Sequence, residues 1–534
     1  MQRTPKTWRR NNHKTRLCIR NIFFILFLLI LLKFPVFAQD NLFSQNSASK
    51  GGVLIFSFVG EVPVLDPGTV KDRGGIQICS SIFEGLVKYD KSSFRIVPAI
   101  ARKWHSQDNL IWTFYLNKGT KFHDGTVCDA NSIKFNFDRQ LNPSHPFSKP
   151  SYGSFSSMKS LFGVYGDHIL KTEAPQDDKF RVILKTPDSL FLNKIAHISA
   201  CIVSPSAVKK YGNLFCENPV GTGSYRFSEW RKPGRIILAS NQNTFLDRAV
   251  FETYLDFDSC QRQLLRGNID IAVDLPRKQA KSAGREIVYK TSKTFDQSIL
   301  LFNCKNRDIK NRNIRKAISY LINKKELSLL FEGELSPSFI YSPLSNFAGE
   351  ETFSPEKCEE LLKSVPDFSN RTFNLIYPSQ MSHIYAPQEL AEKIVNYLKR
   401  GGIKVALKKL SPSDYYRALS LGEYDMALWV NTDISGDSAV NLSFLWSSRA
   451  SKYGKNLSFY SNSSIDSLLQ KAEFTDSASE RLSNYRKIDS ILISDMPSIP
   501  LFYCSQSLAY SRGISNINIH PSGILNISEI WLSR

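Results

Sequence analysis

The stretch RTFNLIYPSQMSHIYAPQELAEKIVNYLKRGGIKVALKKL, residues 371–410, decides the fold class of the chain. Residues 373–377 predict a strand, and Pro387 can open a helix because its missing N–H costs nothing in the first turn. One helical face carries apolar residues four positions apart, Leu390, Ile394 and Leu398. Two glycines end this helix, and the alternation in residues 403–407 predicts a second strand. A strand, a helix and a strand in this order form a βαβ crossover, which predicts parallel pairing and mixed α/β lobes.

Two further helices are predicted from local signals. Asp129 can cap a helix that begins near Ala130, because its side chain can accept hydrogen bonds from the first-turn N–H groups. Residues 79–84 show apolar residues at helical spacing, and Gly85 predicts the end of that helix.

The first 38 residues have the order of a secretory signal peptide. Seven basic and no acidic residues in positions 1–21 precede an apolar run at 22–32, and Val36 and Ala38 suit signal peptidase. Eleven apolar residues cover only about half of a ~30 Å hydrocarbon core, which argues against a membrane anchor. Cys18 precedes the apolar run, so it cannot be a lipid-modified cysteine after one. We expect cleavage after residue 38, a periplasmic location and no stable membrane insertion.

The basic charge does not indicate a nucleic-acid partner. Removing residues 1–38 takes away eight basic residues and lowers the formal charge from +20 to +12. The remaining Lys and Arg are spread along the chain, with only short pairs such as Lys209-Lys210. We therefore expect a solvated basic surface, with no nucleic-acid binding.

Cysteine and histidine spacing gives no sign of a metal site or a cofactor. Eight cysteines follow the signal segment without a Cys-x-x-Cys pair, and several stand beside apolar residues. Disulfides and buried thiols both stay open. The eight histidines are scattered, so we expect neither a metal nor a cofactor.

Catalytic motifs are missing. The chain has no Gly-x-Ser-x-Gly elbow, no His-Glu-x-x-His and no phosphate loop. Gly221-Thr222-Gly223 lacks the third glycine of a dinucleotide loop and predicts a turn entering a strand. An exported, large α/β chain of this kind is more typical of a binding protein than of an enzyme.

Seven runs, in order along the chain, carry a family resemblance. They are LDP at 65–67, FEGLVKYD at 83–90, VPAIARKW at 97–104, WTFYLNKGTKFHDGT at 112–126, PVGTGSYRF at 219–227, NIRKAISY at 313–320 and PSIPL at 497–501. Together they resemble the family-5 extracellular solute-binding proteins, the oligopeptide- and dipeptide-binding group of ABC importers. Ser224 stands where the family has Pro, and Asn117 where it has Arg, both at positions that look structural.

The resemblance implies a two-lobed periplasmic-binding-protein type II clamp with an additional inserted domain. The expected parts are lobe I at 39–84, 191–295 and 500–534, the inserted domain at 85–190, and lobe III at 296–499. It also implies that a short peptide is captured between closing lobes and passed to the permease subunits of an ABC transporter. We expect a monomer.

The resemblance further implies where the ligand's ammonium group binds. In the family, a segment resembling W-x-x-D-x-x-x-P supplies an aspartate, and Trp429-Val430-Asn431-Thr432-Asp433 lies at that place in the order. Asp433 is the expected ammonium anchor, with Asp437 as the second choice because Ser438 replaces the family's proline. Trp429 is expected to wall the pocket and Asn431 to contact the ligand. A loop-capping Asp433 and a core Trp429 are the structural alternatives.

A second candidate segment is the loop at 70–75, which in the family borders the cleft. Lys71 or Arg73 can meet an anionic group of the ligand, although a solvated loop charge is an equal alternative. The sequence does not place the arginine that would bind a carboxylate. Three other functions stay open: a clamp for glutathione or another small solute, an exported peptidase, and a peptide chaperone.

Overall fold

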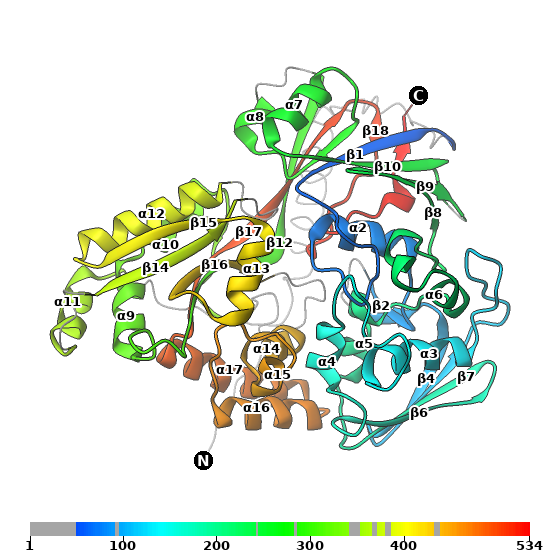
Figure 1. Cartoon of the computed structure of the whole chain (residues 1–534), viewed down its shortest axis with the longest axis horizontal. Helices are drawn as coiled ribbons and strands as arrows, with labels where there is room; N and C mark the ends of the chain where they lie inside the picture. Colours follow the sequence, from blue (N-terminus) through cyan, green and yellow to red (C-terminus); the bar gives the residue numbers. More distant parts are fainter. Residues whose placement is uncertain are drawn as a thin grey trace, which may run out of the picture. The chain divides into compact units, whose positions relative to one another are not determined.

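Two long antiparallel strands, β12 (Ile287–Phe302) and β17 (Ser498–Ser511), run through the middle of the main sheet. The computed structural model describes residues 50–90, 95–241, 244–281, 286–340, 353–365, 371–379, 386–431 and 438–533, all within the unit Ala48–Ser533. β12 pairs with β16 (Met426–Asn431) along one half of its length, while β17 pairs with β11 (Ile271–Val273) at the opposite end. These two strands therefore link two sets of strands into one sheet (Figure 1).

The main sheet has eleven strands. Its order is β15 (Lys404–Leu410), β14 (Thr372–Pro378), β16, β12, β17, β11, β1 (Val53–Val59), β10 (Arg248–Tyr254), β9 (Arg235–Ser240) and β8 (Tyr225–Arg231), with β13 (Glu334–Leu335) paired to β17. β14 and β15 are parallel, in register from Thr372–Lys404 to Pro378–Leu410. α12 (Pro387–Arg400) connects them and buries Leu390, Ile394 and Leu398. The predicted βαβ unit is confirmed.

The C-terminal lobe, as we use the term, comprises β12–β16 and the helices between Arg312 and Asp495, most of which pack around a core that includes Leu300, Leu375 and Leu428. Its helices are α9 (Arg312–Leu321), α10 (Lys324–Leu330), α11 (Pro355–Lys363), α12, α13 (Pro412–Leu421), α14 (Ser438–Trp446), α15 (Ser448–Lys452), α16 (Ser463–Phe474) and α17 (Ala478–Asp495).

The N-terminal lobe packs a second core around Phe56, Ile78 and Phe251. It contains β1 and β8–β11 with α2 (Arg73–Ile82), α6 (Pro205–Tyr211), α7 (Phe257–Leu265) and α8 (Arg277–Lys281). Short pairs β2 (Val87–Tyr89) with β3 (Ile96–Pro98), and β18 (Ile514–Ser515) with β19 (Trp531–Leu532), lie outside the main sheet.

The insertion is the part of the chain that packs a third core between Leu86 and Ile202. Its sheet has the order β4 (Ala101–Gln107), β5 (Ile111–Leu116), β7 (Lys179–Leu184), β6 (Ile169–Gln176). α3 (Ala130–Leu141), α4 (Ser156–Phe162) and α5 (Phe191–Ile195) pack with it around Phe114 and Phe180. The predicted boundaries of the inserted domain, 85 and 190, stay a prediction.

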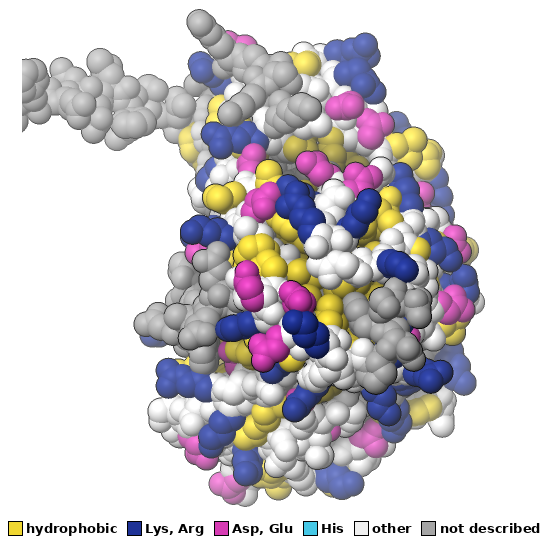
Figure 2. Space-filling view, turned by 90° about the vertical axis from the view of Figure 1, so that its left-hand side faces the viewer, with side chains coloured by type: hydrophobic (Ala, Val, Ile, Leu, Met, Phe, Trp, Pro, Cys, Tyr) yellow, Lys and Arg dark blue, Asp and Glu magenta, His cyan; other side chains and the backbone are white. Residues whose placement is uncertain are grey.

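All eight cysteines after residue 38 are unpaired thiols, and seven of them are buried. No described helix is long and apolar enough to cross a membrane. The face shown in Figure 2 carries Lys and Arg side chains dispersed among apolar and uncharged ones. The signal segment 1–38 lies outside the described residues.

Candidate functional site

A cavity of about 760 Å³ lies between the N-terminal lobe, the insertion and the C-terminal lobe. The N-terminal lobe lines it with residues 58–63 and 70–76, and the C-terminal lobe with 411–416, 429–431 and 455–458. Its volume falls within the range of about 300–1,000 Å³ that is typical of small-molecule sites. Segments far apart in sequence, from three parts of the fold, therefore meet at one partly open cavity.

Aromatic side chains form part of the C-terminal wall. Trp429 on β16 and Tyr416 on α13 meet edge to face, with ring centroids 6.2 Å apart and planes at 87°. The neighbouring Tyr415 is buried and donates its hydroxyl hydrogen bond to the Leu428 carbonyl, which ties α13 to β16. Tyr416 is left 43% exposed at the cavity. This wall offers apolar area with a defined shape, which suits a ligand's side chain.

The sequence-predicted residues of the C-terminal lobe are placed only in part. Trp429 and Asn431 both line the cavity, and Asn431 ends β16 opposite Gln297 of β12. Asp433 and Asp437 lie outside the described residues. The ligand-binding roles of all four stay predictions.

The start of α2 brings charged groups into the cavity from the N-terminal lobe. Asp72 caps the helix, its Oδ1 accepting from the Gly75 N–H at 2.7 Å. Burial raises the pKa of Asp72 to about 6, against the opposing hydrogen bond from Gly75. No described group bonds to its second oxygen, Oδ2. The predicted Arg73 lines the cavity but is held by Asp296 of β12 at 3.0 Å, in a buried ion pair.

Lys71 stands next to this cap with a different environment. It lines the cavity, its side chain is exposed, and burial of part of it lowers its pKa. Within the described part of the chain, no carboxylate lies within ion-pairing distance of its ammonium group. Of the two residues predicted for an anionic group, Arg73 is paired with Asp296, and Lys71 has no carboxylate partner among the described residues.

Lys455 was not predicted from the sequence and faces the same cavity from the C-terminal lobe. Its Nζ lies 5.1 Å from the centroid of the Phe444 ring, and among the described residues it has no carboxylate partner. Burial, with repulsion from Lys71, lowers the pKa of Lys455 to about 8. The local sequence Lys-Tyr-Gly-Lys-Asn is an ordinary polar loop, so only the approach of Lys71 in space marks this residue.

His197 adds a neutral ring beside Lys455. Its Nδ1 accepts from the Ser199 N–H at 3.1 Å and lies 2.7 Å from Ser199 Oγ, and its ring meets Phe444 at 5.3 Å. Burial, reinforced by the charge of Lys455, lowers the pKa of His197 to about 3. The contact with Ser199 caps a short 3₁₀ turn, and Ser199 is only 1% exposed. This Ser–His pair is a structural cap, and it gives no nucleophile facing the cavity.

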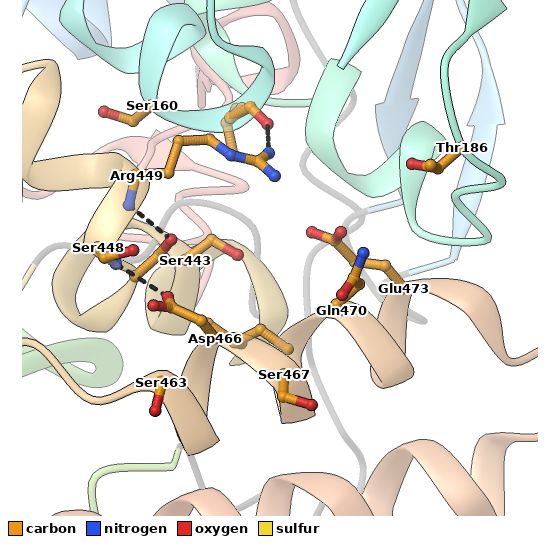
Figure 3. A pocket seen from close by; sticks show the side chains of 13 residues that line it. Ser160, Thr186, Ser443, Ser448, Arg449, Ser463, Asp466, Ser467, Gln470 and Glu473 are labelled. Carbon is orange, nitrogen blue, oxygen red and sulfur yellow. Dashed lines mark hydrogen bonds between the residues drawn. The ribbon is translucent and has the colours of Figure 1, made fainter. Parts of the chain in front are cut away.

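A second cavity, of about 400 Å³, lies along the contact between the insertion and the C-terminal lobe (Figure 3). Seven of its lining side chains are hydroxyl-bearing serine or threonine. Arg449 donates to the Leu161 carbonyl at 3.4 Å, and Asp466 accepts from the Ser448 N–H at 2.9 Å. The first of these hydrogen bonds joins α15 to α4, and the second joins α15 to α16. Among the described residues, no group of three or more His, Cys, Asp or Glu is placed to hold a metal ion.

Several known proteins are similar to the chain in sequence or in structure. The glutathione-binding protein GsiB of Pectobacterium atrosepticum is 26% identical over 494 residues, covering 88% of this chain and 92% of that protein. The periplasmic binding protein DppA of Helicobacter pylori, solved with the peptide STSA, has a TM-score of 0.83 at 24% identity and covers 91% of this chain and 99% of that one. The dipeptide-binding protein of Pseudoalteromonas sp., solved with Met-Leu, also has a TM-score of 0.83, at 20% identity, and covers 90% and 100%.

The two solved structures establish the fold, a mixed α/β clamp of two lobes shared with periplasmic binding proteins. Residues 95–453, more than half of the chain, match the sequence profile of the bacterial extracellular solute-binding proteins, family 5 Middle. The chain therefore belongs to the family-5 bacterial extracellular solute-binding proteins.

Proposed function

We propose that this protein captures short peptides in the interlobe cavity and delivers them to the permease of an ABC importer. The observation that carries the proposal is the lining of the cavity: an aromatic wall of Trp429 and Tyr416 stands beside charged groups of both signs. Lys71 and Lys455 are cationic, and Asp72 is anionic once its proton is lost. A peptide is a zwitterion with side chains, so it can use all three kinds of surface.

Closure of the lobes would be driven by the ligand only if the closed arrangement binds it more tightly. The geometry supports this because the cavity takes lining residues from both lobes, so a ligand that fills it joins them. The long strands β12 and β17 connect the lobes, and register shifts interrupt their pairing between Lys293 and Gln297. We propose this interruption as the place where the connection bends.

Glutathione is the second candidate ligand. It is favoured by the curated relatives at 26–27% identity, which are named as glutathione-binding proteins. Glutathione is a tripeptide with two carboxylates and one ammonium group. Two lysines facing one cavity would suit its excess of negative charge.

The proposed location follows from the sequence. A basic segment, an eleven-residue apolar run and a small-residue end at 36–38 support export with removal of residues 1–38. Amino-terminal sequencing of the protein recovered from the periplasm should begin at Gln39. A start at Met1 on a membrane-bound protein would contradict it.

The test of the function is ligand identification followed by calorimetry. Native mass spectrometry of the freshly purified protein should show a bound peptide, and the ligand-stripped protein should bind di- to pentapeptides or glutathione and gain thermal stability. Peptides should be recovered uncleaved, which separates the proposal from a peptidase. Binding of long unfolded chains alone would favour a chaperone, and failure of every short peptide and of glutathione would overturn the proposal.

A further inference from the structure

Lys71 and Lys455 come from different lobes and bring two ammonium groups to one end of the cavity. Lys71 precedes the cap of α2, while Lys455 follows α15 in the C-terminal lobe. Phe444 lies under the Lys455 ammonium and also meets the His197 ring edge to face. Lys455 and His197 therefore both contact the Phe444 ring, and Lys71 lines the same cavity.

Among the described residues, the other charged groups that line the cavity form no ion pair with Lys71 or Lys455. Asp72 uses Oδ1 to cap α2, and Arg73 is paired with Asp296. Glu61 and Asp274 also line the cavity, and among the described residues neither lies within 4 Å of Lys71 or Lys455 in an ion pair. Two like charges withdrawn from water repel each other, and the pKa of Lys455 is lowered first by its burial and further by the charge of Lys71.

An anionic ligand group would relieve this repulsion. A carboxylate accepts hydrogen bonds from ammonium groups at short range, and such charge-assisted bonds are strong where water is partly excluded. His197 can add a neutral donor: its Nδ1 is occupied as the acceptor of the Ser199 N–H, so the neutral ring carries its proton on Nε2. Phe444 holds the Lys455 chain against an apolar surface.

We propose that Lys455, with Lys71 and His197, forms a carboxylate subsite that binds an anionic group of the captured peptide. The subsite rests on the proposed function for its ligand, a short peptide or glutathione. It is built from both sides of the cavity, so a bound carboxylate bridges the N-terminal and C-terminal lobes. Binding at this subsite thus contributes directly to holding the lobes closed.

The main test compares a carboxylate with its amide. Titration calorimetry of ligand-stripped protein with Ala-Ala-Ala and with its C-terminal amide should show that wild type binds the acid about tenfold or more tightly. Lys455→Gln should bind the acid about tenfold or more weakly than wild type does, and it should no longer distinguish the acid from the amide. If the glycine carboxylate of glutathione occupies the subsite, glutathione and its glycine amide make the same comparison.

Lys305→Gln is the matched control. Lys305 also places an ammonium group over a phenyl ring, with its Nζ 4.2 Å from the centroid of Phe459, but it does not line the cavity. Its variant should bind both peptides as wild type does. Lys455→Gln that binds the acid as tightly as wild type, or that still distinguishes acid from amide, would overturn the subsite.

A pH profile separates a charge role from a packing role. Lys455 loses its proton above about pH 8, so the affinity of wild type for the acid should fall between about pH 7 and about pH 9. The peptide's own amine titrates in the same range, and this contribution is common to every variant. Lys455→Arg stays charged, so its profile should be flatter than that of wild type. Parallel profiles for the two proteins would contradict the role of the Lys455 charge.

The carboxylate subsite can be tested independently of peptide capture. N-acetyl-alanine carries a carboxylate without an ammonium group, and it should bind wild type weakly but saturably and bind Lys455→Gln less. This result would support the subsite even if no peptide or glutathione bound. No binding of N-acetyl-alanine, together with no acid-over-amide preference, would overturn the subsite while leaving peptide capture to its own test.

Discussion

Lys194 of the insertion contacts Glu473 of the C-terminal lobe, with 2.6 Å between Nζ and Oε1. The same ammonium lies 2.8 Å from Oδ2 of Asp188, and the Lys194 side chain is only 1% exposed. Ser189 strengthens the junction, because its N–H donates to the Glu473 carbonyl at 2.7 Å. The contact therefore joins the two parts of the protein beside the second cavity through a buried charge.

Lys194→Met should destabilise the protein strongly. Removing the ammonium leaves the buried carboxylate of Asp188 with His168 and the Leu190 N–H as partners, and unpairing a buried ion costs about 3–5 kcal/mol. Urea unfolding, monitored by fluorescence, measures the loss in the free energy of unfolding. Lys171→Met is the control: its pair with Glu173 is exposed, so its loss should be within about 1 kcal/mol. Equal losses for the two variants would show that the junction contributes no more than a surface pair.

His197 should make stability depend on pH in the acidic range. Its folded pKa is lowered to about 3, while an unfolded histidine titrates near about 6.5. Between these values the unfolded chain binds the proton and the folded protein does not, so stability falls as pH is lowered through this window. The slope for one group is at most about 1.4 kcal/mol per pH unit. Asp72 acts in the opposite direction between about pH 4 and about pH 6, because its folded pKa is raised.

The variant His197→Asn isolates this contribution. Asparagine can still accept from the Ser199 N–H as a cap but does not titrate. Unfolding free energies at about pH 7 and about pH 4 should differ less in the variant than in wild type. An unchanged difference would mean that His197 is protonated in the folded protein as readily as in the unfolded chain.

Local structure could be predicted where the signal is carried by neighbouring residues. Asp129 caps α3 as expected, accepting from the Ser132 N–H at 2.8 Å. The predicted helix at 79–84 was wrong in its bounds, since α2 begins at Arg73 and ends at Ile82. Asp72 caps this helix at its amino end. The two glycines that follow Arg73 interrupt the apolar spacing from which the helix could have been predicted. Phe83, whose N–H bonds to the Cys79 carbonyl, ends the helix before Gly85.

The candidate site was less predictable because its parts are joined only in space. Trp429 and Lys71 came from a family resemblance, which fixes an order along the chain. Lys455 and His197 carry no motif, and their significance depends on the approach of loops from three parts of the fold. The pairing of Arg73 with Asp296 could not be predicted either, because it depends on where β12 lies in the fold, and no local sequence pattern indicates that position.

Gly523 should be needed to keep Arg73 in place. Its φ is +73°, and a Cβ built at this position would overlap the Arg73 guanidinium. Gly523→Ala should therefore shift the Arg73–Asp296 pair, lower the melting temperature and weaken ligand binding. Gly402→Ala has a similar φ of +77° with nothing within 4 Å of its Cβ, so it carries only the backbone strain of about 1–2 kcal/mol. The same decrease in melting temperature in both variants would exclude the overlap with the Arg73 guanidinium as the cause.

Trp429→Ala should weaken the binding of peptides with apolar side chains by about tenfold to a hundredfold. The substitution removes a large apolar wall of the cavity and the edge-to-face contact with Tyr416. Calorimetry with a leucine-containing tripeptide and with triglycine makes the comparison, and the triglycine affinity should change less. Trp230→Ala removes a part-buried tryptophan outside the cavity and should leave both affinities unchanged. An equal loss of affinity for both peptides would indicate that Trp429 supports the hydrophobic core and does not contact the side chains of the ligand.

Asp433→Ala should weaken binding of a free-amine peptide by about tenfold or more, because a buried ammonium would lose its anionic partner. Asp433 lies outside the described residues, two positions after Asn431, which ends β16 at the cavity, so the prediction rests on the sequence and on that end point. The same variant should bind an N-acetylated peptide as wild type does, since this peptide has no ammonium group. Asp437→Ala, the second choice for this role, is the paired variant. If it alone distinguishes free-amine from acetylated peptide, the anchor is Asp437, and if both variants weaken the two peptides equally, neither aspartate binds the ammonium.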